Sequence, residues 1–254
     1  MVLALSNFAW DKENDNLIFN KIKQVGFSNI ECVLTKIKDW SELTTQDIID
    51  YKIYLNNENI KPHSLQSLFY NVKCTGINDV EVIVNHFNRL IEYAKILDTK
   101  ILVFGSPGLR KTVDGWENNI SIIFKEVDKL LMGTDIIVVI EPNAPDYGGE
   151  FFHTVSEIVG FIKKYDFKNI KTMIDTHNLE MQDLNPTFEY LKNIDYISHI
   201  HVSERGLKEI IPKDSHYSLS DAMKKRDYKG IITYEVNKCE NLLTSIEEFY
   251  KIYG

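Results

Sequence analysis

Cysteine is scarce in this chain. The 254 residues contain only Cys32, Cys74 and Cys239, which lie far apart and form no Cys-x-x-Cys pair. An odd number of widely separated cysteines excludes a disulfide framework and a cysteine-based zinc knuckle. We therefore expect any metal site in this protein to use other ligands.

Long apolar runs are also missing. No run approaches the roughly 18 apolar residues that span a bilayer. Residues 1–5 have neither the basic start nor the apolar length of a signal peptide. We therefore expect a cytoplasmic location and no membrane partner.

Basic residues are in the minority. Lys and Arg number 29 against 37 Asp and Glu, which gives a formal net charge of −8. Such a chain repels a nucleic-acid backbone unless a local basic groove compensates, so we expect no nucleic-acid partner.

Glycine and proline are few as well, at 12 and 6 residues, and no stretch rich in them divides the chain. The overall balance of 44% hydrophobic and 26% charged residues is typical of a globular protein. These observations favour a single domain that covers residues 1–254.

Short runs rich in Val, Ile, Leu and Phe alternate with stretches of helical periodicity, which is typical of parallel strands joined by crossover helices. The predicted strands begin near Leu3, Asn29, Lys61, Ile101, Ile136, Lys171, Ile197 and Gly230. The predicted helices cover residues 17–25, 45–56, 80–97, 116–131, 152–165, 186–193, 219–225 and 242–253. Eight units of about 32 residues each suit a closed (β/α)₈ TIM barrel of roughly 250 residues in the α/β class.

An open doubly wound sheet is the main alternative architecture. Its first turn would carry a glycine-rich phosphate motif, whereas the first turn here reads Ser6-Asn7-Phe8-Ala9-Trp10.

Two helix starts have recognisable caps. Asn185 precedes Pro186, and the pair Ser220-Asp221 is predicted to cap the seventh helix.

Polar residues occupy the ends of the last four predicted strands. Strand five ends at Glu141, strand six at Asp175 and strand eight at Glu235, while strand seven carries His199 and, one layer nearer the rim, His201. In a barrel these strand ends meet at one face, where barrel enzymes place their chemistry. We therefore expect Glu141, Asp175, His201 and Glu235 to converge.

Three converging carboxylates raise one another's pKa values unless a cation compensates their charge. Oxygen-rich coordination with a single imidazole favours Mn²⁺, Mg²⁺ or Co²⁺ over a structural zinc site. The sequence therefore predicts one divalent metal ion. A lone acidic residue at a strand end is usually a surface charge or a loop cap, but four such positions on successive strands favour the metal site.

The chain resembles the sugar phosphate isomerase/epimerase family of the xylose-isomerase-like barrels, whose relatives include ketose 3-epimerases and abasic-site endonucleases of the endonuclease IV type. The resemblance is carried by Ile140-Glu141-Pro142-Asn143, Ile174-Asp175-Thr176-His177-Asn178, His199-Ile200-His201-Val202-Ser203-Glu204 and Thr233-Tyr234-Glu235. It extends over nearly the whole chain through Leu5-Ser6-Asn7, Gln66-Ser67-Leu68 and Phe104-Gly105-Ser106-Pro107.

The resemblance implies that Glu141, Asp175, His201 and Glu235 hold one divalent metal, with Mn²⁺ expected first and Mg²⁺, Co²⁺ or Zn²⁺ as alternatives. It also implies that Glu141 and Glu235 exchange a substrate proton. The implied activity is that of an isomerase or epimerase of a sugar or sugar phosphate, acting through a metal-stabilised enediolate. The implied partner is this small molecule, and barrels of this kind often form homodimers through exposed helices.

Two positions depart from the family pattern. Many relatives have a histidine three residues after the aspartate, where this chain has Asn178, and His177 stands one position earlier. The arginine that usually follows two or three residues after His-x-x-Glu comes at once, as Arg205. His177 and Arg205 are both candidates for substrate binding, with a surface loop charge as the alternative for Arg205.

Two further substrate-binding candidates come from strands three and four. Arg110 follows a compact glycine turn and would present its guanidinium near the rim to a phosphate or carboxylate; a solvated arginine is the alternative. Gln66, at the end of strand three, would bond a sugar hydroxyl; a satisfied core amide is the alternative.

Other functions are compatible with the same barrel and metal. A dehydratase or aldolase would use the same enolate chemistry. An endonuclease would need a multi-metal cluster with further histidines on strands three and four, and strand four ends in Gly105-Ser106. A non-catalytic sugar-binding barrel is the remaining alternative.

Overall fold

The eight predicted strands form one parallel sheet that closes on itself. The computed structural model describes residues 1–254. The strands are β1 (Val2–Ser6), β2 (Asn29–Val33), β3 (Lys61–Gln66), β4 (Ile101–Phe104), β5 (Ile137–Ile140), β6 (Ile170–Asp175), β7 (Ile197–Val202) and β8 (Ile231–Tyr234). They pair in chain order, and β8 returns to β1, where Leu5 lies opposite Tyr234. Closure confirms the barrel and excludes the open doubly wound sheet.

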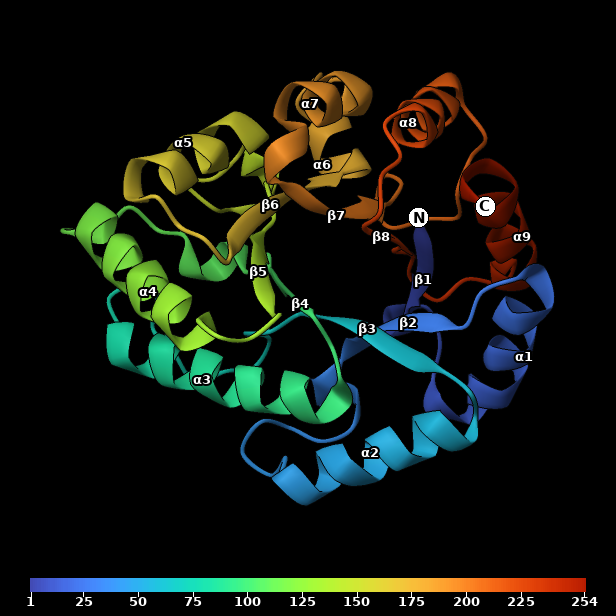
Figure 1. Ribbon diagram of the computed structural model, residues 1–254, viewed down its shortest axis with the longest axis horizontal. Helices are drawn as coiled ribbons and strands as arrows, with labels where there is room; N and C mark the ends of the chain where they lie inside the picture. The colour runs from blue at the N-terminus through green and yellow to red at the C-terminus, as the bar shows by residue number, and fades with distance from the viewer.

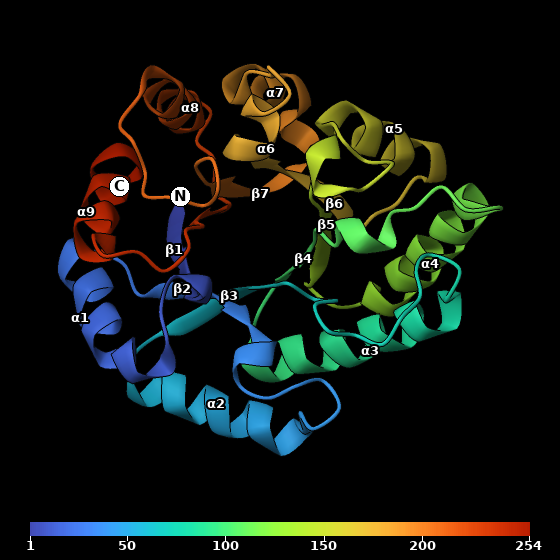
Figure 2. The same cartoon turned by 180° about the vertical axis from the view of Figure 1, so that it is seen from behind.

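The helices lie outside this ring of strands (Figure 1). They are α1 (Asp15–Val25), α2 (Thr45–Asn57), α3 (Val80–Leu97), α4 (Trp116–Leu131), α5 (Val155–Tyr165), α6 (Thr176–Glu180), α7 (Pro186–Asn193), α8 (Asp214–Lys225) and α9 (Leu242–Tyr253). The sequence did not predict the short α6, which follows β6 directly. It lies nearer the barrel axis than α7 in both views (Figures 1 and 2). No helix combines the length and apolar character that crossing a membrane requires.

Three helices begin elsewhere than predicted, and α1 is the first, starting at Asp15 rather than at residue 17. Thr154 caps α5 by a capping box with Glu157, so the helix starts after residue 154 rather than at residue 152. Helix α8 starts at Asp214, five residues earlier than predicted, and Ser220 lies inside it. The predicted cap at Ser220-Asp221 is wrong, because the Ser220 hydroxyl donates to Ile252 O at 2.6 Å and ties α8 to α9. The cap at Asn185 is confirmed, since its side chain accepts from Phe188 N at 3.0 Å.

Alternation along each strand separates two packing regions. In β4, Leu102 and Phe104 face the helices and belong to the large apolar core, whereas Ile101 and Val103 face the barrel interior. The interior cluster contains Ala4, Ile101, Val103, Val139, Met173 and Ile231. Apolar side chains thus fill part of the interior, and polar side chains lie at the C-terminal ends of several strands.

His86 on α3 holds the loop after β3. It is 8% exposed, its Nε2 lies 2.7 Å from Leu68 O, and its ring contacts Trp40 and Phe69 at centroid distances of 4.6 and 4.9 Å. A carbonyl oxygen only accepts, so Nε2 carries the proton. Burial lowers the pKa of His86 from 6.5 to about 4.

This burial makes folding pH-dependent. Between pH 6.5 and 4 the unfolded chain binds a proton at position 86 that the folded protein does not, so the free energy of unfolding should fall by about 3 kcal/mol from this group as the pH decreases through that range. His86→Gln keeps an N–H donor without a titrating group. Urea unfolding should show that the free energy of unfolding depends less steeply on pH in His86→Gln than in the wild type. Equal pH dependence in the two proteins would contradict a lowered pKa for His86.

Candidate metal centre

Four side chains from adjacent strands meet at the C-terminal end of the barrel. Glu141 directly follows β5, and its N–H continues the ladder by donating to Phe104 O at 3.1 Å. Asp175 ends β6, His201 lies in β7, and Glu235 directly follows β8. One ligand atom from each of these four side chains lies within 4.8 Å of the others, close enough to hold one metal ion.

The atoms of this cluster surround Nδ1 of His201. This nitrogen lies 3.3 Å from Glu235 Oε2, 3.4 Å from Glu141 Oε1 and 3.8 Å from Asp175 Oδ2. Both ring nitrogens of His201 are buried and without a hydrogen-bond partner in the protein, and Nδ1 is the one that faces the three carboxylates. A buried, unpartnered nitrogen facing three carboxylates fits a single divalent cation with mostly oxygen ligands.

The charges of the cluster conflict when no cation is bound. Burial, together with the charges of Glu141 and Glu235, raises the pKa of Asp175 to about 7. Burial also raises the pKa of Glu235, whereas contacts with His201 and Asn143 outweigh burial and hold the pKa of Glu141 below its usual value. Keeping all three carboxylates ionised together is therefore unfavourable, and a cation would reduce their repulsion.

Asp175 is fixed by its own helix. Its Oδ1 accepts from Asn178 N at 2.7 Å, which caps α6, and from Ser203 Oγ at 2.9 Å. These two bonds occupy Oδ1 and leave Oδ2 to face His201. Helix α6 thus sets the orientation of one member of the cluster.

Position 105 has no room for a side chain while Glu141 keeps its observed position. Gly105 follows β4, and a Cβ placed on it would overlap Glu141 Oε2. Gly108, three residues along the same loop, has open space at its Cβ position. The carboxylate of Glu141 therefore occupies the volume that a side chain at position 105 would fill.

Gly105→Ala should displace the Glu141 carboxylate and weaken Mn²⁺ binding about 10-fold or more, with the fold retained. Gly108→Ala is the matched control and should bind Mn²⁺ like the wild type. Titration of free Mn²⁺ by electron paramagnetic resonance measures both constants. Unchanged affinity in Gly105→Ala would show that Glu141 does not contribute from this position.

Arg110 does not lie where the sequence predicted. Its side chain is fully buried, and its guanidinium donates to Phe104 O at 2.8 Å and to Phe152 O at 3.3 Å. Burial lowers the pKa of Arg110 to about 9. The prediction of a guanidinium presented at the rim is wrong, because the turn at Pro107–Leu109 folds the arginine inward, where it joins the loops after β4 and β5.

The other three substrate-binding candidates lie outside the four-residue cluster. Gln66 is buried, and its amide nitrogen donates to Ser6 Oγ. His177 is 4% exposed, and its ring stands perpendicular to the ring of Tyr147 at 6.3 Å. Arg205 is exposed in the loop after β7. Asn178 accepts from Ala144 N at 2.9 Å through its side-chain oxygen and so holds the loop after β5.

Sequence reasoning missed two residues near the cluster. Tyr147 lies in the loop after β5, and burial together with the charges of Asp175 and Glu141 raises its pKa. Glu31 lies in β2 with its side chain fully buried in the barrel interior, beside His199 and His201. The signal for Glu31 was present, since an acidic residue between Ile30 and Cys32 breaks an otherwise apolar strand.

A family model described as xylose isomerase-like TIM barrel matches residues 19–251. The chain belongs to this family. The match covers all four cluster residues and seven of the eight strands, from β2 onward. No curated protein sequence matches this xylose isomerase-like barrel significantly.

Solved structures share the barrel at low sequence identity. A 3-keto-D-glucoside 4-epimerase from E. coli is 15% identical with a TM-score of 0.74, covering 99% of this chain and 97% of its own. A D-psicose 3-epimerase from Clostridium cellulolyticum H10, solved with D-tagatose, is 16% identical with a TM-score of 0.76. The match covers 100% of this chain and 90% of the epimerase chain. An AP endonuclease, family 2, from Brucella melitensis is 16% identical with a TM-score of 0.79, covering 99% of both chains. At this identity the likeness shows the fold.

Proposed function

We propose that this xylose isomerase-like barrel is a divalent-metal-dependent isomerase or epimerase of a sugar or sugar phosphate. The observation that carries the proposal is the cluster of three carboxylates around the unpartnered Nδ1 of His201 at the C-terminal end of the barrel. Epimerases among the structures with the same barrel support the reaction class.

Glu141, Asp175, His201 and Glu235 would hold the metal, with Mn²⁺ as the ion we propose first. When bound, a divalent cation polarises the carbonyl and hydroxyl oxygens of a sugar and makes the neighbouring C–H bond more acidic. The resulting enediolate can be reprotonated on either face or on the adjacent carbon, which covers both epimerisation and isomerisation.

Two carboxylates are placed to move that proton. Glu141 follows β5 and Glu235 follows β8, so they enter the cluster from separated parts of the ring, and each reaches Nδ1 of His201. We propose that one removes the proton from the sugar and the other returns it, as general base and general acid.

Three residues at or after the C-terminal ends of strands are proposed to contact the sugar. His177 lies beside Tyr147, and Arg205 is exposed after β7, where it can meet hydroxyls or a phosphate. Gln66 binds Ser6 through its amide nitrogen, which leaves its carbonyl oxygen for a hydroxyl. Arg110 is not included, because its guanidinium is enclosed and bonded to backbone carbonyls.

Incubation with Mn²⁺ and a panel of ketoses and ketose phosphates in D₂O tests the function. Deuterium at carbon 3 identifies an epimerase and at carbon 1 an isomerase; removing the metal with EDTA should abolish the exchange, and added Mn²⁺ should restore it. Nuclear magnetic resonance reports each position. Failure to find deuterium at any carbon of any sugar, with Mn²⁺ bound, would contradict the proposal, whereas carbon–carbon cleavage or water loss would identify an aldolase or dehydratase.

Glu141→Gln and Glu235→Gln should each slow deuterium exchange by about 10²- to 10⁴-fold at saturating Mn²⁺, because an amide cannot accept or return the proton. Glu117→Gln, on the exposed surface of α4, is the matched control and should exchange at the wild-type rate. Rates for either cluster variant within a few-fold of the wild type would remove that glutamate from the proton transfer.

A further inference from the structure

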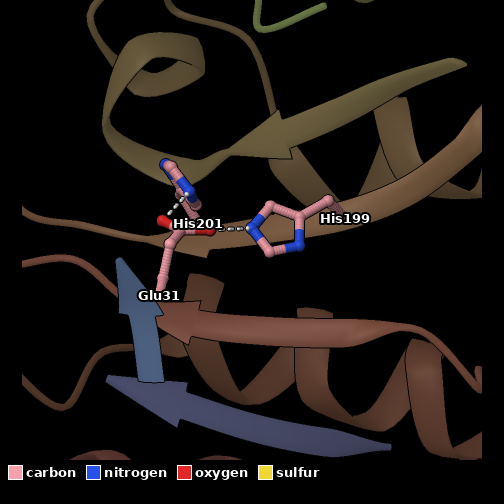
Figure 3. A group of neighbouring side chains, drawn as sticks. All are labelled: Glu31, His199 and His201. Atoms are coloured by element: carbon pink, nitrogen blue, oxygen red, sulfur yellow. Dashed lines mark ion pairs between the residues drawn. The ribbon is translucent and has the colours of Figure 1, made fainter. Parts of the chain in front are cut away.

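Glu31 lies inside the barrel between the two histidines of β7 (Figure 3). Its Oε1 is 2.8 Å from Nε2 of His201, and its Oε2 is 2.8 Å from Nε2 of His199. The side chains of Glu31 and His199 are fully buried and that of His201 is 1% exposed. One carboxylate therefore faces two imidazoles, one through each oxygen.

The carboxylate is held by hydroxyl groups from two other strands. Ser64 on β3 donates its hydroxyl to Glu31 Oε2 at 2.6 Å, and Thr233 on β8 donates to the same oxygen at 3.5 Å. Oε1 has no hydrogen-bond partner and lies at ion-pair distance, 2.8 Å, from Nε2 of His201, which also makes no hydrogen bond. Three contacts thus fix Oε2, which leaves Oε1 directed at one ring nitrogen.

The two nitrogens of His201 have different surroundings, since one carboxylate lies beside Nε2 and three lie beside Nδ1. With a cation among the three carboxylates, the single proton of the neutral imidazole is favoured on Nε2, beside Glu31. Nδ1 then presents its lone pair to the opposite side, where the three carboxylates lie 3.3 to 3.8 Å away. Carboxylates that orient a metal-binding histidine in this way commonly change metal affinity by about 10- to 100-fold when removed.

We propose that Glu31 is a positioning residue of the metal centre, which holds His201 with Nδ1 turned toward the carboxylate cluster. His199 contributes indirectly, because it occupies the second oxygen of Glu31 and limits rotation of the carboxylate. The inference rests on the proposed metal-dependent function. It gives β2 a role in the metal centre, although no residue of β2 binds the metal.

Glu31, His199 and His201 also lie close enough together to hold an ion themselves. The contacts argue against that use, because each nitrogen lies at direct ion-pair distance from a different oxygen of Glu31 and the group is enclosed. We therefore expect one Mn²⁺ per chain in the wild type.

The test measures Mn²⁺ affinity and stoichiometry by electron paramagnetic resonance, with folding checked by circular dichroism. Glu31→Leu should bind Mn²⁺ about 10- to 100-fold more weakly than the wild type. Glu31→Gln keeps one acceptor oxygen for a histidine, so its Mn²⁺ affinity should lie between those of the wild type and Glu31→Leu. If the leucine variant does not fold, the glutamine variant provides the test. Glu189→Gln, a buried glutamate of α7 that accepts from Asn193 at 3.2 Å, is the matched control and should bind like the wild type.

A second readout follows the histidine itself. In the Mg²⁺-loaded wild type, ¹⁵N resonances should show a protonated Nε2 on His201, and Glu31→Leu should lose that signature. Wild-type affinity in both folded Glu31 variants, an unprotonated Nε2 in the wild type, or two Mn²⁺ per chain would each overturn the inference while leaving metal-dependent catalysis intact. A wild type that binds no Mn²⁺ would instead remove the proposed function, and the role of Glu31 with it.

Discussion

Repulsion among three carboxylates at one buried point is the constraint on which the rest of this structure depends. Folding alone does not relieve it, since burial and the charges of Glu141 and Glu235 raise the pKa of Asp175 to about 7. The barrel holds the groups together because each stands at the end of a separate strand whose backbone is fixed by its neighbours on both sides. The fold thus supplies the rigidity that brings like charges together, and a cation would supply the compensation.

The two-residue repeat of the strands connects this point to the interior below it. Outward residues pack against helices, and inward residues comprise an apolar cluster, the polar group of Ser64, Glu31 and His199, and the carboxylates at the strand ends. Along β7, His199 and His201 belong to successive inward layers, with ring centroids 5.0 Å apart. Buried polar side chains are therefore found in the barrel interior as well as in the cluster at the strand ends.

The sequence predicted the barrel and the convergence of strand ends because both follow from short-range patterns: a regular unit length and a polar residue where each apolar run stops. Arg110 was misplaced because its burial depends on a loop conformation that brings Phe104 and Phe152 together around the guanidinium. The start of α5 could have been found from the spacing of Thr154 and Glu157. The contacts of Glu31 with His199 and His201 could not have been found in this way, because only closure of the barrel brings β2 close to β7.

The contact between Asn178 and Ala144 N joins the loop after β5 to α6, and Gln182 extends the connection by donating to His153 O at 2.9 Å. These bonds make the two neighbouring segments one structural unit at the mouth of the barrel. Anyone redesigning specificity by transplanting loops from another barrel would have to exchange both segments together, because either one alone would leave backbone groups of the other without their partners.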